Sequence, residues 1–332
     1  MQDNFQREIN YLRVSVTDRC NLRCLYCMPP EGVKNIPHQE ILRFEEIVRL
    51  IQAAVFVGIR KVRLTGGEPL VRRNLPDLIQ ALNSFPEIND LSLTTNGTLF
   101  ADQARELKEA GLKRVNISLD TLKPERYRYI TRGGKLNDVF EGIKIALALD
   151  LKPVKINTVV IKGFNEDEIC DLARVTLQDP LHLRFIELMP VGFSNHWAPQ
   201  SYLSAEKIKM EIEARFGPLR REDGLSDIPG LFGGGPAKYY RLAGAKGTIG
   251  FIAAQSSHFC ASCNRLRLSA TGALRPCLYN KTEVDLKEPL RKGATLEELT
   301  KLFIHAIQHK PKGYSLTKGW LDKKRVMSQI GG

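Results

Sequence analysis

The chain has 332 residues, of which 43% are hydrophobic and 26% are charged, so a disordered or collagen-like protein is excluded and one large or two modest domains are predicted. No apolar run reaches the roughly 18 residues of a membrane span, and residues 1–20 contain no apolar signal segment, so we expect a cytoplasmic protein. The net charge of +12 favours an anionic partner such as a nucleic acid, a nucleotide or a membrane surface.

Strand and helix patterns alternate through the first 190 residues. This rhythm predicts βα units around a parallel sheet, and six units are too few for the eight of a closed barrel. Six units are compatible with an open doubly wound sheet and with a partial barrel. The predicted strands are 11–17, 61–67, 90–96, 114–120, 152–161 and 182–189, and the helical patterns between them are 44–58, 74–84, 101–111, 136–150 and 165–178.

The predicted strands alternate between apolar and polar side chains. On the first strand Leu12 and Val14 share one face while Arg13 lies on the other. One face therefore packs on helices, and the polar face predicts a ligand-filled lumen whose cations favour an anion. An antiparallel sheet with a solvated face is the alternative, which the long helical connections disfavour. The same alternation in the next strands places further residues on the polar face: Arg63, Thr94, Ser118 and Lys155.

A second region begins near residue 191. It contains an amphipathic helix from about Ala205, a loop rich in glycine and proline at 221–238, a short hairpin over 238–253 and a helix over 295–310. We therefore predict two domains, 1–190 and 191–332, the second a smaller α+β region.

The seven cysteines include two groups of three. We call Cys20, Cys24 and Cys27 the first triplet, and Cys260, Cys263 and Cys277 the second triplet. In a reducing compartment this spacing predicts metal ligands rather than disulfides. Cys170 stands alone in an amphipathic helical pattern and is interpreted as a packed thiol.

The first triplet directly follows the first strand, at the carboxyl end where α/β active sites gather. Three thiolates suit a [4Fe–4S] cluster whose fourth iron has no protein ligand, and such an iron can bind a substrate or cofactor. A closed zinc site with His38 as the fourth ligand is the alternative.

The second triplet encloses a strand-like segment at 264–268, which places Arg265 and Arg267 on one side. Two guanidinium groups beside an open cluster form a site for phosphates or a carboxylate. A zinc site that uses His258 as the fourth ligand is the alternative here.

The first triplet, with its CxxxCxxC spacing and Tyr26 before the last cysteine, resembles the signature of the radical S-adenosylmethionine (SAM) superfamily. The segment GGEP at 66–69 resembles the second motif of that superfamily. The resemblance implies a partial (βα)6 TIM-like barrel. It also implies a [4Fe–4S] cluster whose unique iron binds SAM, which one electron cleaves to methionine and a 5′-deoxyadenosyl radical.

Five segments in order resemble the molybdenum cofactor biosynthesis protein A family, namely SVTDRCNLRCLYCMP, RLTGGEPLVRR, LTTNGT, NISLDTL and FCASCNRLRLS followed by LRPCLY. The resemblance implies a lyase that is a GTP 3′,8-cyclase. In that family the radical takes the hydrogen from ribose C3′ of GTP, and the product is (8S)-3′,8-cyclo-7,8-dihydroguanosine 5′-triphosphate. A second [4Fe–4S] cluster holds the guanine through its open iron.

The same resemblance assigns roles to individual residues. It implies that both triplets ligate clusters and that Tyr26, Gly67, Ser118 and Met189 contact SAM. It implies catalytic roles for three arginines and for a glycine tail that reaches the active site, namely Arg13, Arg265, Arg267, Gly331 and Gly332. We predict that Arg13 or Arg267 holds the terminal carboxylate. The implied GTP contacts are Arg13, Arg63, Thr94, Lys155, Arg265, Leu266 and Arg267.

The implied partners are GTP, an electron donor of the flavodoxin or ferredoxin type and, downstream, cyclic pyranopterin monophosphate synthase. A homodimer is one possible assembly, and the sequence does not determine the oligomeric state. No membrane and no nucleic acid is expected as a partner. Two other interpretations remain. One is a radical SAM peptide-modifying enzyme with an auxiliary cluster, and the other is a zinc-containing nucleic-acid-binding protein, against which the basic residues are scattered.

Overall fold

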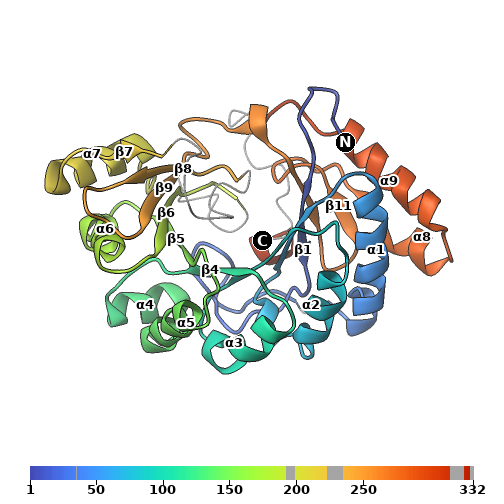
Figure 1. The fold of residues 1–332 in the computed structure, drawn as a ribbon, viewed down its shortest axis with the longest axis horizontal. Coiled ribbons are helices and arrows are strands. Elements are labelled where there is room, and N and C mark those ends of the chain that lie inside the picture. Colours follow the sequence, from blue (N-terminus) through green and yellow to red (C-terminus); the bar gives the residue numbers. More distant parts are fainter. Residues whose placement is uncertain (35, 192–198, 223–234, 315–324, 330–332) are drawn as a thin grey trace.

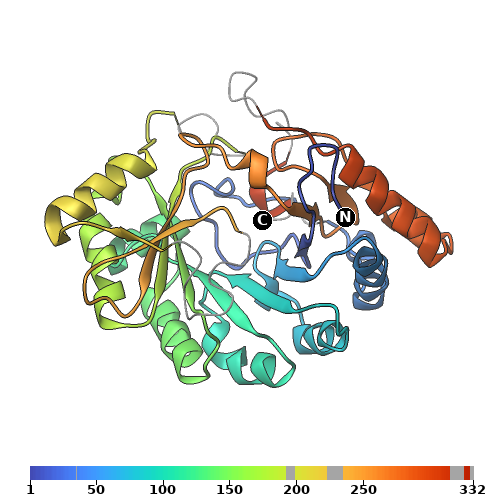
Figure 2. The same ribbon diagram turned by 45° about the horizontal axis from the view of Figure 1, so that its top comes forward.

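The computed structural model describes residues 1–332 except 35, 192–198, 223–234, 315–324 and 330–332. It is an α/β protein built on one curved sheet of twelve strands in the order β12-β11-β10-β1-β2-β3-β4-β5-β6-β9-β8-β7. Helices cover the outer side of this sheet (Figure 1), and the tilted view in Figure 2 shows the strands as an arc with the helices outside it. The predicted partial TIM-like barrel is therefore confirmed.

Six strands form the centre of the sheet and pair in parallel in chain order, each ending one or two residues before its predicted end. They are β1 (Tyr11–Ser15), β2 (Lys61–Thr65), β3 (Asp90–Thr95), β4 (Arg114–Ser118), β5 (Lys155–Val160) and β6 (His182–Glu187). The helices of this half are α1 (Phe44–Phe56), α2 (Leu75–Asn83), α3 (Phe100–Glu109), α4 (Pro124–Thr131), α5 (Leu136–Ala148) and α6 (Ile169–Gln178). Sequence reasoning missed α4, a short and highly charged segment.

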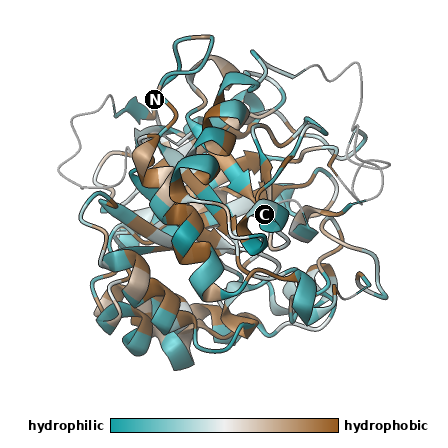
Figure 3. Ribbon diagram, turned by 90° about the vertical axis from the view of Figure 1, so that its right-hand side faces the viewer, coloured by the Kyte–Doolittle hydropathy of each residue, from teal (hydrophilic) through white to brown (hydrophobic). Residues whose placement is uncertain are grey.

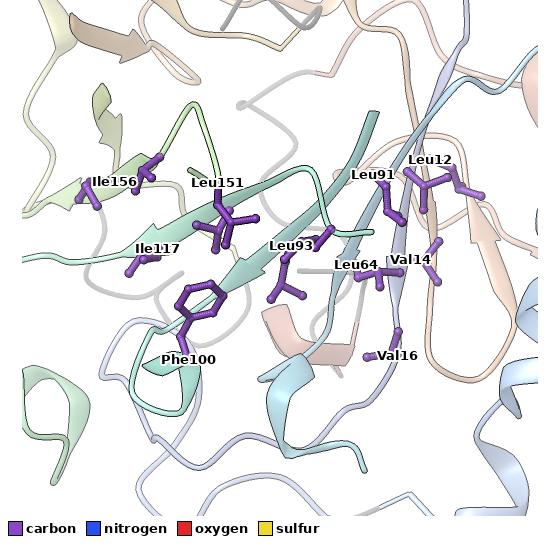
Figure 4. Close-up of a cluster of buried hydrophobic side chains, with 14 of the residues drawn as sticks. Leu12, Val14, Val16, Leu64, Leu91, Leu93, Phe100, Ile117, Leu151 and Ile156 are labelled. Carbon is purple, nitrogen blue, oxygen red and sulfur yellow. The ribbon is translucent and has the colours of Figure 1, made fainter. Parts of the chain in front are cut away.

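The apolar residues of the alternating strands pack outward onto these helices. Leu12, Leu64 and Leu93 are fully buried, and Phe100 of α3 packs with them in the same core (Figure 4). Burying one such side chain stabilises the fold by roughly 1.5–3 kcal/mol. With the apolar face used in this way, the inner face of the arc is left to the polar residues.

The C-terminal region adds strands to both edges of the central sheet. β9 (Thr248–Ile252) pairs in parallel with β6, and β10 (Arg265–Leu268) pairs in parallel with β1. The predicted hairpin is confirmed, because β8 (Lys238–Arg241) pairs antiparallel with β9. The remaining strands are β7 (Arg220–Arg221), β11 (Ala273–Arg275) and β12 (Val284–Asp285), and the 3-10 turns are η1 (His38–Glu40), η2 (Pro69–Val71), η3 (Glu166–Glu168), η5 (Cys260–Ser262) and η7 (Met327–Gln329).

The remaining helices are α7 (Ala205–Phe216), α8 (Lys287–Arg291) and α9 (Leu296–Gln308). α9 packs against α1, and in Figure 3, which faces this side, hydrophilic and hydrophobic residues alternate around each helix. The predicted division into 1–190 and 191–332 falls between β6 and α7, while strands from both sides share one sheet. Within the described ranges, no helix is long and apolar enough to cross a membrane.

Candidate active site: a cationic lumen between two cysteine triplets

The inner face of the arc encloses a cavity of about 420 Å³, which we call the lumen. This volume lies in the range of small-ligand pockets. The five residues that alternation placed on the polar face all line it, which confirms their predicted placement. They are Arg13, Arg63, Thr94, Ser118 and Lys155.

Sequence reasoning missed three further lining residues, Tyr11, Arg114 and Arg184. Arg114 donates two hydrogen bonds to the Asp90 carboxylate, at 2.8 and 2.6 Å. The Arg184 Nε atom donates to the Tyr239 hydroxyl at 2.6 Å. The signal was present, since Tyr11 and Arg114 each open a strand whose later polar residues were assigned to the lumen.

The lumen holds several cations that lie close together. Burial lowers the pKa of Arg13 to about 9, and the neighbouring Arg267 adds to this effect. Burial likewise lowers the pKa of Arg63 to about 9 and that of Lys155 well below its usual value. Such crowding is unfavourable without a counter-charge, so the lumen is suited to an anion with several charges.

Several buried polar atoms in the lumen have no hydrogen-bond partner among the residues that the structure describes. Buried polar groups are normally paired, so such a concentration in one cavity indicates a polar ligand. They are the Tyr11 hydroxyl, Arg13 Nε, Thr94 Oγ1, Arg114 Nη1 and Asn157 Oδ1.

The first triplet lies on a loop that follows β1 and is held against the end of α4. The backbone N–H of Arg23 donates to the Thr131 carbonyl at 3.1 Å, and Arg132 donates to the Arg23 and Met28 carbonyls at 3.0 and 2.9 Å. Burial raises the pKa of Cys24 well above its ordinary value, and the nearby Cys27 and Asp120 raise it further. The three thiols therefore lie within electrostatic range of one another.

Of the predicted SAM contacts, Tyr26 lies on this loop, whereas Met189 packs in a hydrophobic cluster that also contains Cys277 of the second triplet. Tyr26, Ser118 and Met189 line the lumen, and the Tyr26 hydroxyl donates to the Asp120 carboxylate at 2.7 Å. Gly67 is not a lining residue. A Cβ atom there would lie 2.2 Å from the Arg19 carbonyl oxygen, so only glycine permits this approach to the loop.

The second triplet lies at the opposite end of the strands, since Cys263 precedes β10, which runs parallel to β1. All three of its cysteines line the lumen, as do Arg265 and Arg267. The Arg265 Nη2 atom lies 3.7 Å from the Cys263 sulfur. Burial opposes ionisation of Cys263, but Arg265 and Lys310 outweigh it and lower its pKa to about 6.

Sequence reasoning missed two buried cations that donate hydrogen bonds to backbone carbonyls at and near the second triplet. Lys310 donates to the Arg265 and Pro276 carbonyls at 2.8 and 2.5 Å. Arg7 donates to the Cys260 carbonyl at 2.8 Å and pairs with Asp3 at 2.6 Å. No local sequence pattern predicts these contacts, because Lys310 and Arg265 are 45 positions apart in the chain and Arg7 and Cys260 are 253 positions apart.

Both triplets fit iron–sulfur clusters better than a single metal ion. Within the described parts of the chain, no group of three or more His, Cys, Asp or Glu side chains could hold one metal ion. A cluster places each thiolate on a different iron, so its sulfur atoms need not converge. The candidate zinc ligands do not join either triplet, because His38 is exposed and the His258 Nδ1 atom contacts the Ala254 carbonyl at 3.2 Å.

One predicted GTP contact, Leu266, points away from the lumen. The Leu266 side chain is fully buried in the apolar core, because it alternates with Arg265 and Arg267, so only its backbone is available to a ligand. Gly331 and Gly332 lie outside the described residues.

Two family models match the chain: the radical SAM superfamily at residues 14–175 and Molybdenum Cofactor Synthesis C at residues 181–316. Curated GTP 3′,8-cyclases from Desulforamulus reducens and Pelotomaculum thermopropionicum are each 56% identical to it over the full length of both chains. A third from Moorella thermoacetica is 53% identical, again over the full length of both.

Solved structures show the same fold at low identity. Streptococcus suis SuiB bound to S-adenosylmethionine has a TM-score of 0.57 at 15% identity, covering 85% of this chain and 64% of that one. Native anSMEcpe with bound AdoMet has a TM-score of 0.53 at 17% identity, covering 91% and 81%. The two family models and the full-length relatives agree with the two cysteine triplets and the lumen. The chain therefore belongs to the GTP 3′,8-cyclase family of radical SAM enzymes.

Proposed function

We propose that this chain converts GTP to (8S)-3′,8-cyclo-7,8-dihydroguanosine 5′-triphosphate, as a lyase of molybdenum cofactor biosynthesis. One observation carries the proposal: an arc of lumen cations starts beside the second triplet and continues across the sheet. Its members are Arg265, Arg267, Arg13, Arg63, Arg114, Lys155 and Arg184. A triphosphate supplies the several negative charges that this arc lacks.

We assign the first triplet and the four predicted SAM contacts to the binding of SAM. The first triplet holds one [4Fe–4S] cluster, and Tyr26, Gly67, Ser118 and Met189 contact SAM. When bound, the two clusters and SAM supply a 5′-deoxyadenosyl radical for the hydrogen atom at ribose C3′ and an open iron for the guanine. Asp120 positions Tyr26 through the hydrogen bond at 2.7 Å, so the aromatic ring is fixed at the edge of the lumen.

We assign the opposite end of the lumen to GTP. The second triplet holds the other [4Fe–4S] cluster and directs the base. Arg13, Arg63, Thr94, Lys155 and the segment 265–267 bind the nucleotide, with Leu266 contributing through its backbone. A guanidinium group can donate two parallel hydrogen bonds to the oxygens of one phosphate. Because these guanidinium groups are buried, water is kept away from the bound phosphates.

Catalytic roles are proposed for Arg13, Arg265 and Arg267, which line the lumen next to the second triplet. The glycine pair Gly331 and Gly332 is proposed to reach the same site. Deleting the pair is expected to reduce cyclisation while both clusters and SAM binding persist.

The electron donor is proposed from the charge of the surface near the first triplet. Exposed Arg19 precedes the first triplet and exposed Arg128 lies on α4 beside it, so an acidic electron donor of the flavodoxin or ferredoxin type suits this side. Cyclic pyranopterin monophosphate synthase is the proposed consumer of the product. A cytoplasmic location is supported by the cysteine ligands, which need a reducing compartment. A homodimer stays a prediction.

The test uses GTP deuterated at ribose C3′, SAM and a one-electron reductant with the anaerobically reconstituted protein. We expect deuterium in the 5′-deoxyadenosine and one cyclised nucleotide per SAM consumed. SAM cleavage that is independent of GTP and yields unlabelled deoxyadenosine would overturn the proposal. About eight irons per chain are expected for two cubane clusters.

A further inference from the structure

We propose that Tyr11 is a specificity-determining residue, whose hydroxyl donates a hydrogen bond to the terminal phosphate of the bound triphosphate. This inference rests on the proposed function and deepens it, because it explains how the lumen distinguishes GTP from GDP.

Tyr11 occupies a position from which its side chain reaches the lumen. It is the first residue of β1 and shares the strand face of Arg13, two residues later. Its backbone lies level with Lys61 on β2 and Arg265 on β10. The side chain lines the lumen, yet the residue is only 3% exposed, so bulk water does not reach its hydroxyl.

The hydroxyl of Tyr11 has no hydrogen-bond partner within the described part of the chain. A buried tyrosine hydroxyl normally has a hydrogen-bond partner, because leaving it unpaired destabilises the folded state. Phenylalanine would fill the same volume without that penalty. The missing partner is therefore expected to arrive with a ligand.

The surroundings of the hydroxyl identify that ligand as an anion. The Arg63 guanidinium lies 5.3 Å from the centroid of the Tyr11 ring, and both side chains line the lumen. Burial would raise the pKa of Tyr11, but Arg63, Arg114 and Arg13 lower it. Three guanidinium groups thus act on one oxygen, and Arg114 Nη1 is itself without a partner among the described residues.

The position of Tyr11 along the cationic arc selects the terminal phosphate. With the base at the second triplet, the nucleotide begins beside Arg265 and Arg267. Arg13 interacts electrostatically with these two arginines and with Tyr11. The Tyr11 ring itself lies 5.3 Å from Arg63 of β2, on the side of β1 away from β10, and Arg114 lies farther in the same direction on β4. The phosphate farthest from the base therefore meets Tyr11 and Arg114.

The experiment compares Tyr11→Phe with the wild type, both carrying two clusters, by anaerobic titration with GTP, GDP and GMP. A hydrogen bond to a charged acceptor predicts about tenfold weaker GTP binding, with GDP and GMP affinities unchanged. The readout is the ratio of GTP to GDP affinity within each protein. Tyr127→Phe is the matched control, since the Tyr127 hydroxyl is also buried and unpartnered among the described residues but does not line the lumen.

An unchanged ratio of GTP to GDP affinity in Tyr11→Phe would overturn the inference, and so would an equal loss for all three nucleotides. Loss of the ratio in Tyr127→Phe as well would assign the effect to packing and likewise overturn it. Failure of the proposed function is distinguishable, because the wild type would then not bind GTP.

Discussion

The surroundings of the two cysteine triplets differ in charge. Beside the first triplet lie the buried carboxyl groups of Glu68 and Asp120, and burial raises their pKa values to about 7 and about 6. Beside the second triplet lie Arg265 and Lys310, which lower the pKa of Cys263 to about 6. The two ends of one lumen thus favour opposite charges, which matches a cationic sulfonium cofactor at one end and a polyphosphate at the other.

The sharpest way to break this comparison is Cys24→Ser. The variant removes one ligand of the first cluster and should reduce 5′-deoxyadenosine formation more than about 100-fold, since changes outside the ligand set alone can cost 10–100-fold. The measurement is deoxyadenosine released per chain. Cys170→Ser is the control, because Cys170 belongs to neither triplet and lies on α6. Wild-type SAM cleavage in Cys24→Ser would refute the assignment.

Cys263→Ser tests whether the two ends are independent. Cyclised product should fall by about 100-fold or more while the first cluster stays assembled and still cleaves SAM. The iron content per chain and deoxyadenosine formation are measured together. Simultaneous loss of both clusters would show that the triplets depend on each other.

Lys310→Met tests the cationic support of the second cluster without removing a ligand. Methionine keeps an unbranched side chain in this buried position but removes the charge and the two hydrogen bonds to the Arg265 and Pro276 carbonyls. We expect about tenfold slower cyclisation and a lower reduction potential of the second cluster, because a nearby positive charge favours the reduced state. The reduction potentials of both clusters are measured, and Lys310→Arg should restore the potential of the second cluster. A shift in the first cluster alone would contradict the comparison.

The smallest expected effect is a change in how stability depends on pH. Burial raises the pKa of Asp120 from 3.8 to about 6, although the Tyr26 hydroxyl opposes this. The folded state therefore holds the proton more tightly, and this contribution is complete below pH 3.8 and is lost as the pH rises through about 6. As the pH rises from about 4.5 to about 7, the wild type should lose this contribution, whereas Asp120→Asn has no carboxyl group to lose it. The unfolding free energy of Asp120→Asn should therefore fall by about 2 kcal/mol less than that of the wild type.

Chemical unfolding at both pH values measures this difference. Asp171→Asn, on the exposed surface of α6, is a suitable control. Parallel pH profiles for the wild type and Asp120→Asn would show that the Asp120 pKa is not raised.

Local patterns in the sequence predicted much of this architecture. Alternation alone placed Arg13, Arg63 and Lys155 in the lumen, because a strand that buries one face must turn the next residue to the other. The same rule also applies to Arg114 and Arg184, which lie on strands that were recognised but were not themselves assigned to the lumen.

Long-range contacts could not be predicted in this way. The pairing of β10 with β1 joins segments about 250 residues apart, and nothing in either segment encodes its partner. The support of Cys260 by Arg7 depends on that pairing, since it arises only once the two ends of the chain meet.

The placement of β9 and β10 at the two edges of the central sheet has a consequence for biosynthesis of the enzyme. The first triplet leaves the ribosome early, but the wall of the lumen is complete only after the strands at 248–252 and 265–268 have been made. At roughly 5–20 residues per second, that interval lasts on the order of 10–50 seconds. During it a nascent chain has the ligands for radical initiation without an enclosure for the radical, so maturation is safest when iron–sulfur loading follows release of the full chain.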